Sequence, residues 1–308
     1  VSKFGISKLV AIDMDEYRLS IINRELNQNF EKENKKYTNY LLDINNYDLL
    51  LKVFNKEEPD IVYHAAAFKH VDLVEQNWLH ASINNIKSTY NVCKISLKEN
   101  VKKIIFISTD KAVEPINFLG LSKSVGEKIT QTFGKVSLNN SFSVVRFGNV
   151  VGSSGSLLDT IKHQLEVSNK IKVTDKNMTR YFMTISDAVN LVLISSKISN
   201  SGDCHVLKMG EPVKILDIVK SIVDQHNATS LGSNQKIEIE FSGIRPGEKI
   251  SEKLFDEKRV IKTSNEFILN EKNSSNLDIE SVEKFVNDIQ IKNWEKENFK
   301  NYLLNFSS

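Results

Sequence analysis

The chain has 308 residues, with 41 Lys and Arg against 39 Asp and Glu, a formal net charge of +2. This balance creates no uniform field that would attract nucleic acid or an anionic membrane surface, so we predict no nucleic-acid partner. Two cysteines without CxxC spacing and six histidines without ligand spacing indicate a reducing, cytoplasmic setting and predict no metal site.

The first half of the chain alternates short apolar segments with longer amphipathic ones. Strands are expected over residues 9–13, 40–44, 60–64, 103–108 and 142–147. Helices are expected over residues 17–29 and 71–99. Such alternation is typical of βαβ units with a buried parallel sheet. Right-handed crossovers then predict an α/β fold with a doubly wound, Rossmann-type sheet.

The alternation loosens after about residue 151. We assign residues 1–151 to a dinucleotide-binding domain, with about 182–209 returning to it. Residues 152–181 and 210–270 are assigned to a smaller α+β substrate-binding lobe. Residues 271–308 are predicted to form a polar tail with a C-terminal helix.

The chain contains no Gly-rich turn of the kind that holds a dinucleotide's pyrophosphate after the first strand. Gly5 is the only glycine in the first 100 residues. Either the sheet binds no dinucleotide, or the first strand and its loop precede Val1. Asp13 favours the second alternative, because an acid at the end of the next strand binds the adenosine ribose. We therefore expect a longer natural N-terminus. A chain without that central strand should be poorly stable, because two parallel strands would keep unpaired backbone groups.

Five strings occur in a fixed order along most of the chain. They are HAAAFKHV (64–71), STDKAVEP (108–115), VRFGNVVGSSGS (145–156), TRYFMT (179–184) and RPGEK (245–249). In this order they resemble the CapD-type UDP-N-acetylglucosamine 4,6-dehydratases, extended short-chain dehydrogenase/reductases of polysaccharide biosynthesis. The resemblance implies a bound NAD or NADP that takes a hydride from sugar C4 and returns it to C6, while protein groups move protons.

The resemblance assigns the proton transfers to the string that follows the strand at 103–108. Asp110 matches the general acid that helps the C6 hydroxyl leave, and Lys111 matches the base for the C5 proton. Thr109 and Ser108 would orient the sugar. The alternative is an ordinary Asp-Lys pair at a strand end.

Lys123 matches the lysine that binds the nicotinamide ribose. The residue one helical turn earlier is usually a tyrosine that deprotonates O4, but here it is Leu119, which cannot transfer a proton. The O4 base is left open between Thr109 and a water held by Lys123 and Asp110. Large membrane-anchored members often lack this tyrosine, so Leu119 favours that subgroup. The catalytic domain would then lie at the inner face of the membrane, attached through a missing N-terminal region; an inactive paralogue is the alternative.

Further matches fall on cofactor positions. Asp13 favours NAD over NADP, because a carboxylate repels a 2′-phosphate, and Asp43 resembles the acid beside the adenine. Asn85 fits a structural asparagine of the superfamily, with a helix-surface asparagine as the alternative. The residues matched to cofactor contacts are Asp13, Asp43, Ile44, Ala65, Ala66, Ala67, Asn85, Ser108 and Lys123.

Another set of matches falls on substrate positions. Arginine suits a diphosphate because its planar fork bonds two oxygens at once, and Arg245 lies in a rigid Arg-Pro-Gly-Glu turn. The residues matched to UDP-sugar contacts are Lys69, His70, Asn149, Thr174, Arg180, Arg245 and Glu248.

The leading functional hypothesis is therefore a UDP-N-acetylglucosamine 4,6-dehydratase. A nucleotide-sugar epimerase of the same superfamily is the first alternative, although C4 epimerisation needs neither a C5 base nor a C6 acid. A catalytically silent nucleotide-sugar-binding module is the second, motivated by Leu119 and the absent glycine turn. We expect a homo-oligomer, as is common in this superfamily.

Overall fold

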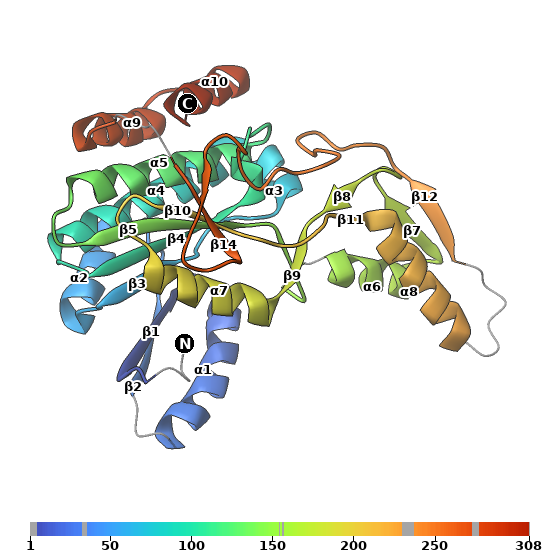
Figure 1. Ribbon diagram of the computed structural model, residues 1–308, viewed down its shortest axis with the longest axis horizontal. Helices are drawn as coiled ribbons and strands as arrows, with labels where there is room; N and C mark the ends of the chain where they lie inside the picture. The colour runs from blue at the N-terminus through green and yellow to red at the C-terminus, as the bar shows by residue number, and fades with distance from the viewer. Residues whose placement is uncertain are drawn as a thin grey trace.

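The computed structural model describes residues 5–32, 36–153, 155, 157–229, 237–272 and 277–307. Its main body is a six-stranded sheet with the strand order β13-β14-β10-β5-β4-β3 (Figure 1). The parallel strands are β3 (Ile61–His64), β4 (Lys103–Thr109), β5 (Ser141–Phe147) and β10 (Cys204–Leu207). This parallel α/β core confirms the predicted Rossmann-type fold class.

Helices cover both faces of this sheet (Figure 1). Ile104 of β4 packs in the core with α4 (Trp78–Lys98) and α5 (Phe118–Val136). Its neighbour Ile105 belongs to the core on the opposite face, with α7 (Ile185–Ile198). Successive strand residues thus bury on opposite faces, which explains why the sheet strands are continuous apolar runs.

Two further strands form a separate parallel pair. β1 (Lys8–Asp13) pairs with β2 (Lys36–Leu41), and α1 (Glu16–Lys32) connects them. The second strand was expected at 40–44, and that position is wrong by several residues. The chain turns at Asp43, whose side-chain oxygen accepts the Asn45 N–H at 2.9 Å, before α2 (Tyr47–Glu57) begins.

The helix expected over 71–99 is broken into two. α3 (Val71–Gln76) ends at Asn77, whose φ of −114° and ψ of 38° leave the helical region, and α4 begins at the next residue. The Asn77 side chain donates to the Leu73 carbonyl at 3.0 Å. An asparagine that bonds nearby backbone in this way competes with the helix, which accounts for the break.

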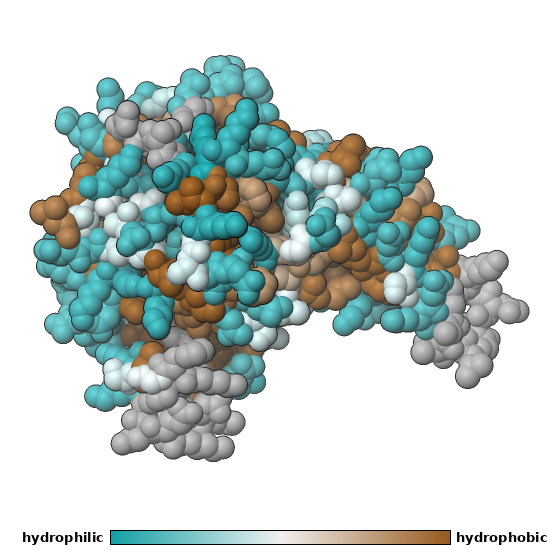
Figure 2. Space-filling model, viewed as in Figure 1, coloured by the Kyte–Doolittle hydropathy of each residue, from teal (hydrophilic) through white to brown (hydrophobic). Residues whose placement is uncertain are grey.

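A smaller lobe, at the right of Figure 1, has a hydrophobic core of its own. Its elements are α6 (Leu157–Val167), β7 (Lys170–Val173), α8 (Ile215–Thr229) and β12 (Glu238–Phe241), with β7 and β12 paired in parallel. Two short pairings lie near its junction with the main body. They are β6 (Asn149–Val151) with β9 (Phe182–Thr184), and β8 (Thr179–Arg180) with β11 (Val213–Lys214). Polar side chains cover most of both lobes in the view of Figure 2.

The end of the chain returns to the main body. β13 (Val260–Lys262) and β14 (Ile268–Glu271) join the large sheet by antiparallel pairing, although the sequence analysis assigns residues up to 270 to the substrate lobe. The polar tail contains two helices, α9 (Ile279–Ile291) and α10 (Lys296–Ser307), which share the core of α4 and α5. None of the helices in the described ranges combines the length and apolar character needed to cross a bilayer.

Candidate active site

The three contiguous residues Thr109, Asp110 and Lys111 come together where β4 ends. Strand β4 passes into a short 3-10 turn, η1 (Asp110–Ala112). Asp110 is fully buried; its Oδ1 accepts the Thr109 hydroxyl at 2.8 Å and lies 2.9 Å from the Lys111 Nζ. Its Oδ2 has no hydrogen-bond partner within the described part of the chain. One carboxylate oxygen is therefore held by the protein, and the other is left for a further group.

Gly148 lies close to Asp110. A Cβ added at Gly148 would lie 3.0 Å from Asp110 Oδ2. A second glycine supports the turn from the helix side, because a Cβ at Gly120 would lie only 2.1 Å from the Lys111 carbonyl oxygen. Helix α5 can begin so close to the Asp110–Lys111 turn only because position 120 carries no side chain.

Lys123 and Leu119 both lie on α5 and are both buried. The Lys123 Nζ donates to the Ile107 carbonyl at 2.9 Å and lies 4.6 Å from the centre of the Phe106 ring. Burial lowers the pKa of Lys123 to about 8. Leu119 belongs to the core that α4 and α5 share, so the usual position of the tyrosine is filled by an apolar packing residue.

Ser108 is part of a buried charged network that the sequence analysis missed. Its hydroxyl donates to Glu127 Oε1 at 2.5 Å. Arg146 binds the same carboxylate through Nε at 3.0 Å and Nη2 at 2.6 Å, and reaches Glu271 Oε2 at 2.8 Å. The sequence signal for this network is an arginine between the apolar residues Val145 and Phe147 of strand β5. This network holds the end of β4 in place, and the Ser108 hydroxyl already donates its hydrogen bond to Glu127.

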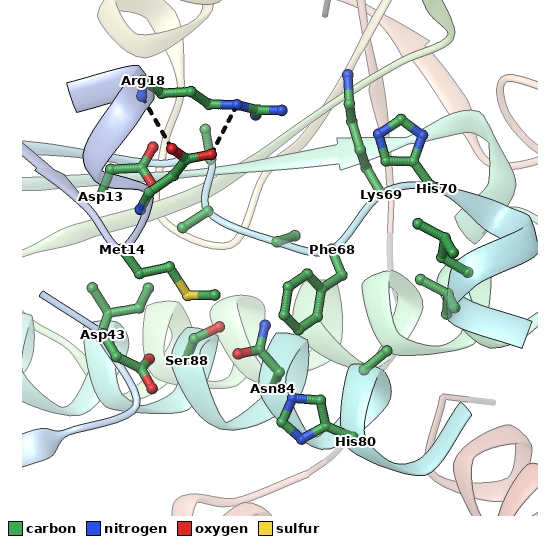
Figure 3. A pocket seen from close by; sticks show the side chains of 18 of the residues that line it. Asp13, Met14, Arg18, Asp43, Phe68, Lys69, His70, His80, Asn84 and Ser88 are labelled. Carbon is green, nitrogen blue, oxygen red and sulfur yellow. Dashed lines mark hydrogen bonds and ion pairs between the residues drawn. The ribbon is translucent and has the colours of Figure 1, made fainter. Parts of the chain in front are cut away.

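A cavity of about 580 Å³ lies at the carboxyl ends of β1 and β3 (Figure 3). It brings together eight of the predicted ligand-binding residues, which are Asp13, Asp43, Ile44, Ala65, Ala66, Ala67, Lys69 and His70. Side chains of its wall that were not among the predicted ligand-binding residues include Met14, Arg18, Phe68, His80, Asn84 and Ser88. Ligands of open α/β sheets bind at this end of the strands.

The cavity wall fits the adenosine half of a dinucleotide. The Asp13 and Asp43 carboxylates of this wall can accept hydrogen bonds from hydroxyl and amino groups, and the alanines are small enough to let a ligand approach the backbone. The Asp43 segment is held by α4, because Asn91 Nδ2 donates to the Ile44 and Asn45 carbonyls, each at 3.1 Å. Asn45 also donates to Asn84 Oδ1 at 2.7 Å.

Asn85 ties the next part of the wall to two helices. Its Oδ1 accepts the Phe68 N–H at 2.8 Å, and its Nδ2 donates to the Phe68 carbonyl at 3.1 Å and the Ser122 hydroxyl at 3.2 Å. It is only 3% exposed, so the alternative of a helix-surface asparagine is wrong. Asn85 thus fixes the backbone at Phe68, between Ala67 and Lys69.

Cations line another part of the cavity. The Arg18 Nε lies 3.3 Å from Asp15 Oδ2, and Figure 3 shows the Arg18 and Lys69 side chains extending on the same side of the cavity. Burial and the charge of Arg18 lower the pKa of Lys69. His70 is exposed, and Gly155 lies against its ring, since a Cβ there would be 2.5 Å from His70 Cε1.

The remaining substrate positions lie near or within the smaller lobe. Arg180 is buried, and its guanidinium donates hydrogen bonds to three carbonyls, those of Thr179 at 2.7 Å, Lys249 at 2.8 Å and Ile250 at 3.1 Å. It therefore fastens the end of the Arg245–Lys249 turn to β8. Within that turn the exposed Arg245 donates its N–H to Glu248 Oε2 at 3.2 Å.

The same turn contacts the start of α5. Asn117 Nδ2 donates to the Gly247 carbonyl at 2.7 Å, so the turn lies close to the helix that carries Leu119 and Lys123. Asn149 begins β6, and its N–H donates to the Tyr181 carbonyl at 3.1 Å. Thr174 follows β7, and its hydroxyl contacts Met178 Sδ at 3.1 Å.

Comparison with known proteins identifies relatives over most of the chain. CapD, a capsular polysaccharide biosynthesis protein of Staphylococcus aureus, is 40% identical over 260 residues, which cover 84% of this chain and 43% of CapD. A UDP-glucose 4-epimerase of Rickettsia rickettsii is 34% identical over 234 residues, covering 74% of this chain and 65% of that protein. The solved structure of Pen from Bacillus thuringiensis matches with a TM-score of 0.72 at 30% identity, covering 85% of this chain and 79% of that one.

The chain spans less than half the length of CapD. Residues 1–272 match the family described as polysaccharide biosynthesis protein. That match extends from before β1 to just past β14 and includes all five strings that indicated the CapD-type resemblance. The chain therefore belongs to the polysaccharide biosynthesis protein family.

Proposed function

We propose that this chain carries the catalytic domain of a nucleotide-sugar 4,6-dehydratase that converts UDP-N-acetylglucosamine to a UDP-4-keto-6-deoxy sugar for polysaccharide biosynthesis. The arrangement of Asp110 and Lys111 at the end of β4 carries the proposal. Asp110 Oδ2 is buried and has no hydrogen-bond partner among the residues that the structure describes, while Oδ1 is held by Thr109 and Lys111. A hydrogen bond with a substrate hydroxyl would give that oxygen the partner it lacks in the described chain.

The two side chains supply an acid and a base side by side. Lys111 would accept the C5 proton at Nζ, and Asp110 would deliver a proton through Oδ2 to the departing C6 hydroxyl. Before the reaction both groups must be neutral, and a sugar that excludes water favours the neutral form of each. The two groups lie 2.9 Å apart, so attraction between the new ammonium and the new carboxylate would stabilise the state that proton transfer produces.

The dinucleotide proposed for the cavity is NAD or NADP. When bound, its nicotinamide would supply reversible hydride transfer, which leaves proton movement to the protein. Asp13, Asp43 and Ala66 would hold its adenosine half, and Lys123 its nicotinamide ribose. We favour NAD, because the Asp13 carboxylate would repel a 2′-phosphate. The Arg245–Glu248 turn and the loop at Asn149 are proposed to hold UDP.

An epimerase is the alternative that has a specific observation in its favour, namely the sequence relative in Rickettsia rickettsii that bears that name. C4 epimerisation removes no C5 proton and expels no water. It would leave the Asp110–Lys111 pair without a task.

The test uses the natural full-length protein with UDP-N-acetylglucosamine in deuterated solvent. Loss of water with deuterium at C5 supports the dehydratase, whereas a C4 epimer without deuterium at C5 supports the epimerase. Tight UDP binding without turnover supports the silent module. Lys111→Met should remove C5 exchange, while Lys253→Met, which changes an exposed lysine paired with Glu114 at 2.7 Å, should not. Exchange at the parental rate in Lys111→Met would show that another group is the base.

A further inference from the structure

Glu252 is a buried carboxylate for which the proposed reaction has no task so far. It lies just after the Arg245–Lys249 turn, and its side chain is 2% exposed. The chain two residues before it is held, because the Ile250 carbonyl accepts from both Arg180 and the Thr179 N–H, the latter at 2.9 Å. The Ser251 hydroxyl also bonds the Thr179 hydroxyl at 2.8 Å.

The carboxylate of Glu252 lies between two lysines. Its Oε1 is 4.0 Å from the Lys111 Nζ, and its Oε2 is 3.7 Å from the Lys249 Nζ. Oε2 makes no hydrogen bond within the described part of the chain. A buried carboxylate oxygen without a hydrogen bond is costly to keep, and Lys111 and Lys249 are cations within 4.0 Å of this carboxylate. Lys249 is itself anchored by donating to the Val113 carbonyl at 2.8 Å.

Lys111 therefore lies between two acidic side chains, of which only Asp110 transfers a proton in the proposed reaction. Asp110 is the nearer, at 2.9 Å, and Glu252 the farther, at 4.0 Å. The proposed reaction requires Asp110 to be protonated at its start, and a neutral acid attracts the lysine far less than a carboxylate does. Glu252 donates no proton in that reaction.

We propose that Glu252 is a positioning residue that holds the Lys111 amine in place and stabilises the ammonium formed when Lys111 takes the C5 proton. This inference rests on the proposed function. The charged groups involved are Asp110 and Glu252 around Lys111, and Lys111 and Lys249 around Glu252. Glu252 touches neither substrate nor cofactor in this scheme; it acts through Lys111.

The first test measures C5 deuterium incorporation against pH in the full-length protein and in Glu252→Gln. Without the nearby anion, Lys111 should lose its proton at lower pH, so the midpoint of the rising limb should fall by about one pH unit. The plateau rate should fall about tenfold, because a weaker base accepts the proton less readily. The matched control is Glu114→Gln, which removes an exposed carboxylate three residues from Lys111. An unchanged midpoint in Glu252→Gln would overturn the proposal.

A second measurement needs no turnover. Trace acetylation of Lys111 by acetic anhydride, followed against pH by peptide mass spectrometry, should also move to lower pH in Glu252→Gln, by about one unit. Lys249→Met should move it the other way, because Glu252 is then left with Lys111 as its cation. This variant also serves if Glu252→Gln does not fold. If the parent shows no C5 exchange, the proposed function fails. The labelling still decides whether Glu252 controls Lys111, and equal profiles in parent and variants would exclude that role.

Discussion

The two oxygens of the Asp110 carboxylate are in different states: Oδ1 lies 2.9 Å from the Lys111 Nζ, whereas Oδ2 has no hydrogen-bond partner among the described residues. The asymmetry has a simple cause. Thr109 and Lys111 are the chain neighbours of Asp110, and the 3-10 turn brings both onto the same oxygen. The other oxygen lies against Gly148, where an added Cβ would be 3.0 Å from it.

We expect Asp110→Asn to lower the rate of water loss by about 10²- to 10⁴-fold, the usual contribution of a general acid, because an amide cannot deliver the proton. Its shape is nearly that of the carboxyl group, so UDP affinity should stay within about threefold. Product formation followed by NMR and UDP binding followed by calorimetry check the two parts. A variant retaining a tenth or more of the parental rate would remove Asp110 from the acid role.

Lys123 should make stability depend on pH in the alkaline range. Burial lowers its pKa from 10.5 to about 8, so between these values the unfolded chain binds more protons than the folded one. Stability should therefore rise with pH from about 8 toward 10.5. Lys123→Met should be more stable than the parent by about 2 kcal/mol at pH 7, after allowing for the lost hydrogen bond to Ile107. Urea unfolding at pH 7 and pH 10 tests this, and the difference should shrink at the higher pH.

His64 should make the free energy of unfolding depend on pH in the acid range. Burial, together with the charge of Lys123, lowers its pKa from 6.5 to about 3, so the folded chain keeps the ring neutral. The unfolded chain protonates below pH 6.5, and stability present above that pH is lost as the pH falls toward 3. We expect His64→Gln to flatten the decline in unfolding free energy between pH 6.5 and pH 4. Parallel curves for parent and variant would contradict this assignment.

Arg180 and Arg245 should respond differently to substitution. Arg180→Lys removes the fork that binds the Lys249 and Ile250 carbonyls, so it should reduce stability by about 1–3 kcal/mol as well as UDP affinity. Arg245 is exposed, and Arg245→Met should lower UDP affinity about tenfold or more while leaving stability within about 0.5 kcal/mol. Calorimetry and denaturant unfolding separate the two. Unchanged UDP affinity in Arg245→Met would remove it from the proposed UDP site.

The parts of the fold that could be predicted are those that depend on residues close together in the sequence. The apolar runs of β3, β4 and β5 reveal a buried parallel sheet, and Thr109 to Lys111 meet because they are consecutive. The end of β2 and the break before α4 depend on Asp43 and Asn77, whose side chains take over local backbone bonds. Such competition has no periodic signal.

Contacts between distant elements could not be read from the sequence. The Ser108 hydroxyl was expected to face a ligand, yet its partner is Glu127, nineteen residues away on a packed helix. Arg180 was expected to hold a diphosphate, and here its guanidinium binds carbonyls about 70 residues along the chain. Glu252 lay outside every recognised string. Its importance depends on which lysines the tertiary fold places around it.

The attachment of the β1–β2 pair has a consequence for how the cavity behaves. In the described chain these strands pair with one another, and the six-stranded sheet ends at β3. Amide side chains of α4 hydrogen-bond to the segment after β2, Asn91 with the Ile44 carbonyl and Asn84 with the Asn45 side chain. Amide exchange should therefore be faster in β1 and β2 than in β4 and β5, because a smaller cooperative unit opens at lower free energy. Replacing Asn91 with Ala should widen that gap, so this asparagine of α4 would set how readily the segment that carries Asp43 separates from the main body.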